Sequence, residues 1–239
     1  MAAREALVSA LRRAFAAHAD AARAVPMQAY MKSAMPFHGI AAPQRRRLMD
    51  AAVKASPCTG TRELADTMRA LWDGATHREQ RYAAMELARV GPHRPLLDAS
   101  MLPLYERMIV EGAWWDICDD ISGEALGALL QRDAAAVKPV LRRWARGDAL
   151  WLRRAAILAQ RRLKRGFDAP LLYETILPSI GDSPFAGEFF IRKGIGWALR
   201  ERSYTAPDEV QAFCREYAAQ LAPLTVREAL KVIVKRSRA

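Results

Sequence analysis

The 239 residues of this chain suffice for one large domain or two small ones, with a sizeable buried core. Apolar residues make up 51% and charged residues 26%, which excludes a disordered chain, and no apolar run approaches the ~20 residues of a membrane span. Thirty Arg and seven Lys against 26 acidic residues leave a net charge of +11. This charge predicts a polyanionic partner such as nucleic acid, although a high-GC coding sequence would also favour Arg over Lys.

The first predicted element is an amphipathic helix with Leu7, Leu11 and Phe15 on one face. Its basic, Ala-rich character is also typical of an organellar presequence. Glu5 and Asp20 interrupt that character. We therefore expect a surface helix that packs its three large apolar side chains inward.

Apolar residues recur at i, i+3, i+4 and i+7 along the rest of the chain, and good helix formers dominate it. The breaks between these periodic segments contain Pro36, Gly39, Pro57, Gly60, Gly91, Pro92, Gly147, Gly166, Gly181 and Pro184. The pattern predicts an all-α protein of roughly a dozen helices. No linker interrupts it, so we expect a single domain over residues 1–239.

Five segments look alike when Tyr82, Asp119, Arg154, Lys193 and Glu228 are aligned, at steps of 37, 35, 39 and 35 residues. Helix pairs repeating at this length are typical of HEAT-like α-solenoids, in which each pair buries its apolar face against the next. Chance self-similarity within a helical bundle is the alternative. In a solenoid the second helices of the pairs line a concave groove, which we expect to be basic and to contain the aligned residues.

The aligned Asp119 points to a particular chemistry, because a carboxylate in a basic groove repels phosphate. Trp115 lies four residues before Asp119, and Trp197 lies four after Lys193, so each pair shares a helix face. Cleavage of an N-glycosidic bond passes through an oxocarbenium-like sugar, which a carboxylate stabilises, and a purine alkylated at N3 or N7 is already a cationic leaving group. The alternatives are structural: Asp119 pairs with Arg154 between helices, and the two Trp pack in the core.

Metal and cofactor motifs do not occur in the sequence. The three Cys and four His form no CxxC, no HExxH and no other metal-ligand spacing, and there is no GxxxxGK[ST] or GxGxxG motif. We therefore expect neither a metal nor a cofactor. Cys118, beside Asp119, is expected to be a small packing residue.

Several blocks of the sequence carry a family resemblance. The run Trp114-Trp115-Asp116-Ile117-Cys118-Asp119 resembles the WWDxxD signature of the AlkD-like DNA alkylation-repair glycosylases. Blocks at residues 30–46, 151–158 and 188–201 also resemble that family in order and spacing, and the run at 224–229 fits it as well. The stretch around Gly181 to Gly187 is slightly longer than the family pattern, which could alter the rim of the groove. The resemblance covers nearly the whole chain.

The resemblance implies a HEAT-like solenoid that acts in base excision repair as a monofunctional glycosylase. Its substrate would be double-stranded DNA carrying positively charged N3- or N7-alkylated purines, excised without base flipping. By position, Trp115 and Trp197 would contact the deoxyribose, Asp119 would stabilise the sugar cation and help to position water, and Arg154 would anchor the backbone. Tyr30 would lie near the same strand.

The family also contains relatives that bind DNA structures without excising bases. A non-catalytic HEAT-like module that binds DNA, RNA or a protein partner therefore remains the alternative. We expect a monomer in the bacterial cytoplasm, associated with the nucleoid through DNA and not with a membrane. The residues predicted to contact DNA are Tyr30, Lys32, Arg45, Arg46, Arg81, Arg153, Arg192 and Lys193.

Overall fold

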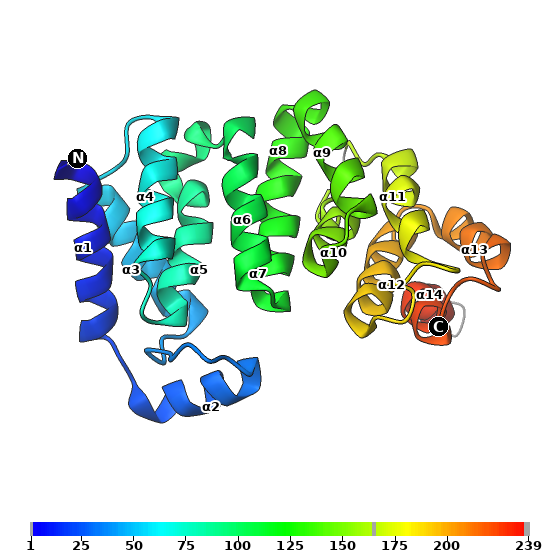
Figure 1. The fold of residues 1–239 in the computed structure, drawn as a ribbon, viewed down its shortest axis with the longest axis horizontal. Helices are drawn as coiled ribbons and strands as arrows, with labels where there is room; N and C mark the ends of the chain where they lie inside the picture. The colour runs from blue at the N-terminus through cyan, green and yellow to red at the C-terminus, as the bar shows by residue number, and fades with distance from the viewer. Residues whose placement is uncertain (1, 164–165, 237–239) are drawn as a thin grey trace. The chain divides into compact units, whose positions relative to one another are not determined.

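The structure is a computed structural model that describes residues 2–163 and 166–236. Most of these residues lie in helices (Figure 1). No strand occurs in those residues, so the all-α prediction is confirmed. Contacts between residues divide the chain into two compact units, Met1–Met108 and Ile109–Ala239. A single domain over residues 1–239 stays a prediction.

The first unit begins with a helix whose apolar face is fully buried. Leu7, Leu11 and Phe15 of α1 (Ala2–Ala17) are each 0% exposed and α1 packs on α3 and α4, which confirms the predicted inward face. The other elements of this unit are α2 (Ala21–Met31), α3 (Ala42–Ala55), α4 (Thr61–Asp73), α5 (Arg78–Glu86), the 3₁₀ turns η1 (Leu87–Arg89), η2 (Gly91–Leu96) and η3 (Ala99–Met101), and α6 (Leu102–Gly112), which ends in the second unit.

The break predicted at Gly39 is a buried loop that one carboxylate holds in place. The side chain of Glu79 accepts hydrogen bonds from the backbone N–H groups of His38 at 2.9 Å, Gly39 at 2.9 Å and Ile40 at 3.1 Å. Gly39 has a φ of +85°, and a Cβ there would lie 2.0 Å from the carbonyl oxygen of Asp20. Only glycine therefore fits at this crossing.

Two buried histidines make the stability of the first unit depend on pH. The ring of His38 stacks on that of His77 at 3.7 Å, and burial lowers the pKa of His38. Burial also lowers the pKa of His93, whose Nε2 accepts a hydrogen bond from the Cys58 N–H at 2.9 Å. In the unfolded chain these pKa values return to about 6.5, so the unfolded chain binds more protons once the pH falls below that value. The contribution is present above about pH 6.5 and is lost as the pH falls through the folded-state pKa values.

We expect the free energy of unfolding, measured by urea denaturation, to fall between about pH 7.5 and about pH 5.5. A His93→Gln variant should be less stable at the upper pH but should show a shallower dependence on pH. His18 is exposed, so His18→Gln serves as the control and should keep the full dependence. Equal pH dependence in the His93 variant and the wild type would contradict this account.

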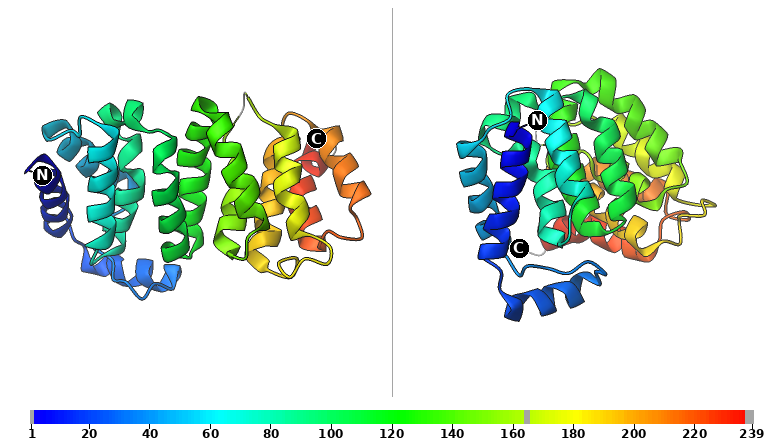
Figure 2. Two further views of the ribbon diagram at one scale, coloured as in Figure 1. Left: turned by 45° about the horizontal axis from the view of Figure 1, so that its top comes forward. Right: turned by 60° about the vertical axis from the view of Figure 1, so that its left-hand side comes forward.

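The second unit contains the remaining helices. They are α7 (Trp115–Asp120), the π-helical turn η4 (Ile121–Leu126), α8 (Gly127–Arg132), α9 (Ala134–Arg146), α10 (Leu150–Leu158), α11 (Ala169–Ile176), the 3₁₀ turn η5 (Leu177–Ser179), α12 (Phe189–Ser203), α13 (Pro207–Glu216) and α14 (Pro223–Arg236). Helices α7, α10, α12 and α14 pack side by side in that order and form one layer. Helices α9 and α11 pack on each other behind it, and the views agree that α12 (gold) lies against α14 (red) (Figures 1 and 2).

The predicted repeat is visible in the bonds between neighbouring helices of this layer. Asp119 of α7 pairs with Arg154 of α10, and Lys193 of α12 pairs with Glu228 of α14, each across 35 residues. These four residues belong to the aligned column of the sequence, so the register of that alignment agrees with the packing. The arrangement is consistent with an α-solenoid of HEAT-like helix pairs.

Candidate functional site

A buried ion pair joins α7 to α10. Asp119 accepts two hydrogen bonds from Arg154, from Nε to Oδ1 and from Nη2 to Oδ2, both at 2.7 Å. The side chain of Asp119 is 12% exposed and that of Arg154 is 5% exposed. This parallel, two-point geometry is the strongest that a guanidinium makes with a carboxylate. Removing one partner of such a pair costs about 3–5 kcal/mol because the other charge is left buried and unpaired.

Arg154 also connects the pair to α12. Its Nη1 donates to the carbonyl oxygen of Phe190, and a Cβ on Gly194 would lie only 3.1 Å from that nitrogen. The glycine therefore makes room for the guanidinium. One arginine side chain in this way fixes the relative positions of three neighbouring helices of the layer.

Cys118, next to Asp119, has a structural role. It is 1% exposed, its Sγ donates to the carbonyl oxygen of Trp151 at 3.2 Å, and burial raises the pKa of its thiol. A thiol held in its protonated form is a poor nucleophile. The predicted role of Cys118 as a packing residue is confirmed.

Arg161 joins Asp119 to Trp197. Its guanidinium lies over the indole of Trp197 at 4.2 Å, and its Nη2 donates to the backbone carbonyl of Asp119 at 3.2 Å. The indole Nε1 in turn donates to Glu201 at 3.1 Å. Burial lowers the pKa of Arg161, which shows that its charge is partly removed from water. The indole is thus held both at its face and at its nitrogen.

The backbone after Asp119 is shaped to admit this arginine. The helix widens into the π-helical turn η4, and a Cβ on Gly123 would lie 2.5 Å from the Nη2 of Arg161. Such π-helical turns are rare and occur often at functional sites. Neither Gly123 nor Arg161 was predicted from the sequence. Helical spacing could have indicated them, because Gly123 lies four residues after Asp119 and Arg161 lies seven after Arg154, so each shares a helix face with a predicted site residue.

The two neighbouring tryptophans of the WWDxxD run have different surroundings. Trp114 packs against Trp151 at 6.0 Å and Phe190 at 5.4 Å, within an aromatic cluster at the starts of α7, α10 and α12. Trp115 is the first residue of α7, is half-buried and lies one helical turn before Asp119. Trp115 and Asp119 therefore share a helix face, as the spacing predicts.

The predicted DNA contacts of the second unit have protein partners. Lys193 pairs with Glu228 at 2.9 Å, and Arg192 donates through Nε to the carbonyl of Ala186 at 2.8 Å. Arg153 is buried and donates to the carbonyl oxygens of Gly147, Pro178 and Arg146 and to Ser179. Lys193 stays more than a third exposed, whereas the donors of Arg153 are turned inward.

Arg153 gives a prediction that separates support of the fold from a phosphate contact. Replacement by Met leaves several carbonyl oxygens without donors, so we expect the free energy of unfolding to fall by about 2–3 kcal/mol. The salt dependence of DNA affinity should stay at the wild-type value, because the side chain is not turned toward solvent. A slope of log K against log salt that falls by about 1 would instead identify a phosphate contact.

The predicted contacts of the first unit fall into exposed and buried residues. Tyr30 is 73% exposed, and Lys32, which ends α2 with a φ of +49°, and Arg46 are exposed as well. Arg45 is buried in an ion pair with Glu86 at 2.7 Å. The guanidinium of Arg81 lies 4.6 Å from the centre of the Trp72 ring. Tyr30, Lys32 and Arg46 are therefore the exposed members of this set, whereas Arg81 is partly exposed and Arg45 is buried.

Two further findings concern metals and membranes. In the described ranges, no three or more His, Cys, Asp or Glu side chains are grouped so that they could hold a metal ion. None of the described helices has the length and apolar character needed to cross a membrane.

Comparisons with known proteins identify the family of the chain. A family model described as DNA alkylation repair enzyme matches residues 11–233. A solved structure titled as a predicted DNA alkylation repair enzyme from Enterococcus faecalis superposes with a TM-score of 0.73 at 28% sequence identity, covering 89% of this chain and 95% of the other. No curated protein matches the sequence.

Proposed function

We propose that this chain, which belongs to the DNA alkylation repair enzyme family, is a monofunctional DNA glycosylase that excises N3- and N7-alkylated purines from duplex DNA. Family membership supports an enzyme of alkylation repair with DNA as its partner. The observation that carries the finer proposal is the Asp119 carboxylate, which is held by Arg154 and tied through Arg161 to Trp197.

The reaction needs little from the protein beyond charge and position. The bond from C1′ to the purine nitrogen breaks, its electron pair neutralises the cationic purine, and the sugar becomes an oxocarbenium-like cation. Water then adds at C1′ and its proton passes to solvent. Asp119 stabilises the cation with an oriented negative charge that is already present in the free enzyme, so no reorganisation is needed during the reaction.

Arg154 has two roles in this proposal. It fixes the direction of the Asp119 carboxylate, and in the described structure the three bonds to Asp119 and Phe190 use three of its five N–H groups. Anchoring of a backbone phosphate by the other two would require the duplex to expose a side chain that is 5% exposed in the free chain. The remaining exposed part of Asp119, 12% of its side chain, is what would face the sugar.

Arg161 is proposed as a positioning residue. Its guanidinium covers one face of the Trp197 indole, which also packs against the core, and the part of the ring that stays exposed would meet the sugar. Arg161 would thus hold the indole in place for contact with the deoxyribose, which is compatible with excision that does not flip the base into a pocket.

The ion pair also supports a second candidate function, a non-catalytic module that binds DNA. A buried Asp–Arg pair between helices is what a purely structural contact would look like. A glycosylase releases a free base from methylated DNA, whereas a binding module does not. Incubation of the purified chain with methylated duplex DNA should release free 3-methyladenine or 7-methylguanine. A chain that binds the duplex and releases neither base contradicts the glycosylase and supports the module.

A further inference from the structure

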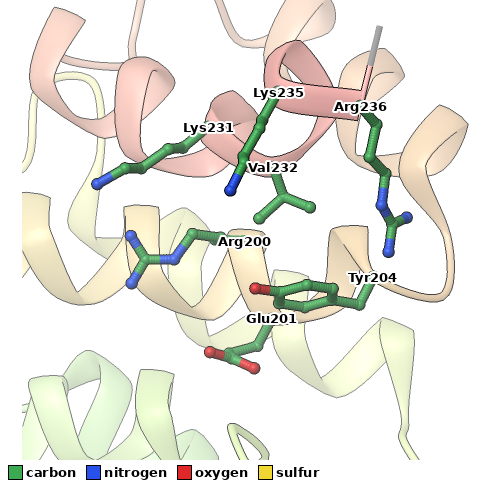
Figure 3. A pocket seen from close by; sticks show the side chains of 7 residues that line it. All are labelled: Arg200, Glu201, Tyr204, Lys231, Val232, Lys235 and Arg236. Carbon is green, nitrogen blue, oxygen red and sulfur yellow. The ribbon is translucent and has the colours of Figure 1, made fainter. Parts of the chain in front are cut away.

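A pocket of about 600 Å³ lies between α12 and α14, separate from the Asp119–Arg154 pair. It is shown in Figure 3 and is lined by Arg200, Glu201, Tyr204, Lys231, Val232, Lys235 and Arg236. The volume is within the usual range for ligand sites. Four of the seven lining residues are cationic and one is acidic, so the pocket is strongly electropositive.

The cations around this pocket outnumber the acids near them. Arg200 and Lys193 share the carboxylate of Glu228, at 2.7 and 2.9 Å. Lys231, Lys235 and Arg236 form no ion pair with any described residue. Glu201, the acid of the lining, accepts the indole N–H of Trp197. Cations that surround a hollow repel one another, and an anion bound among them removes that repulsion.

The pocket continues the helix faces on which the proposed site lies. On α12, Trp197, Glu201 and Tyr204 are spaced i, i+4 and i+7, which is one face of a helix. On α14, Lys231 and Lys235 follow Glu228 at i+3 and i+7. The bonds of Glu228 to Lys193 and Arg200 join the two helices at the near end of this surface.

One side of the pocket is aromatic. Tyr204 is 50% exposed, and the guanidinium of Arg236 lies 5.5 Å from the centre of its ring. Figure 3 shows the Tyr204 ring and the side-chain ends of Lys235 and Arg236 on opposite sides of the same hollow. An amphipathic wall under a cationic rim suits a sugar phosphate better than a small inorganic ion, because it offers the sugar a surface to pack on.

We propose that this pocket binds a backbone phosphodiester of the DNA strand that passes Trp197. Tyr204 lies seven residues beyond Trp197 on the same helix, which is about 10 Å at 1.5 Å per residue. Each nucleotide of one strand advances about 3.4 Å along the duplex axis. A strand that runs along α12 would therefore place this phosphate within about three nucleotides of the lesion. The inference rests on the proposed function only in taking DNA as the ligand.

The test measures binding to an undamaged duplex, so it does not depend on base release. The variant is Lys235→Gln with Arg236→Gln. The matched control is Arg146→Gln with Arg215→Gln, which removes the same charge from exposed positions on α9 and α13. We expect the slope of log K against log salt to fall by about 1 in the variant and to stay at the wild-type value in the control. Equal slopes in variant and control would overturn the proposal.

A scan with neutral methylphosphonate linkages locates the phosphate. One linkage within about three nucleotides of a fixed lesion analogue should weaken wild-type binding several-fold and should not weaken the double variant further, because both changes remove the same contact. An effect of equal size in both proteins would overturn the assignment. Calorimetry with inorganic phosphate tests whether the pocket binds free phosphate and not a phosphate of DNA. Binding of free phosphate, combined with an unchanged DNA slope in the variant, would also overturn it.

Discussion

An Asp119→Asn variant is expected to release alkylated bases about 10²–10³-fold more slowly than the wild type while binding duplex DNA at least as tightly. The oriented negative charge that would stabilise the sugar cation is lost in this variant. Repulsion between the carboxylate and DNA phosphates is lost as well, so affinity should not fall. The rate is measured in single turnover with enzyme in excess, which removes differences in binding from the comparison.

The control for this variant must separate chemistry from stability. Asn keeps one acceptor for Arg154. The free energy of unfolding should therefore fall by less than the cost of a fully broken buried pair, which is about 3–5 kcal/mol. Glu209→Gln removes the charge of another carboxylate of the second unit, which pairs with Arg202 and accepts from Tyr173. It should retain the wild-type rate. A normal rate in the Asp119 variant would show that the Asp119–Arg154 pair is structural only.

A Gly123→Ala variant is the second change expected to have a large effect. The new methyl group would lie 2.5 Å from the Nη2 of Arg161, and this flexible side chain must move away. Its contacts with Trp197 and the carbonyl of Asp119 would then be lost. Because small misplacements in an active site are costly, we expect base release to slow by about 10- to 100-fold.

The Gly123→Ala variant should not lose stability, although it should lose activity. Alanine within a helix is favoured over glycine by about 1 kcal/mol, so the melting temperature of the Gly123 variant should be maintained or raised. Gly127→Ala is the matched control one turn later, where the new Cβ approaches Ala159 and Leu163 and not Arg161. It should retain activity. A large loss of activity in the control would assign the effect to the helix backbone.

Arg161→Met tests the same contact from the other side. It should slow base release as much as Gly123→Ala does. The double variant should be no slower than either single variant, because all three lose the same interaction. Losses that add up would show that the two residues act separately, and Arg161 would then have no positioning role through Gly123.

The sequence predicted the elements that local patterns control. Helical periodicity and the Pro and Gly breaks indicated an all-α chain, and pairing of Asp119 with Arg154 was the structural alternative for these residues. The bond of Lys193 to Glu228 was not predicted, although both residues belong to the aligned column. These contacts recur at one repeat length, so a single chain already contains the signal several times.

The features that depend on tertiary packing were not predictable in this way. The π-helical turn η4 and the approach of Arg161 to Gly123 arise from contact between α7 and the segment after α10. Spacing assigns a residue to a face, but it does not determine which of thirty arginines turns inward to carbonyl oxygens, as Arg153 does, or pairs with a buried acid, as Arg45 does. Those outcomes follow from which polar groups the fold buries and must satisfy.

We propose that the Asp119–Arg154 pair supports cleavage of the glycosidic bond of an alkylated purine. The decisive experiment uses a duplex that carries a single 7-methylguanine, with the purified chain in excess. We expect release of free 7-methylguanine that leaves an unbroken strand with an abasic site, and we expect this release to be about 10²–10³-fold slower in Asp119→Asn than in the wild type. Tight binding of this duplex by the wild type without release of the base, or release at equal rates by the two proteins, would contradict it.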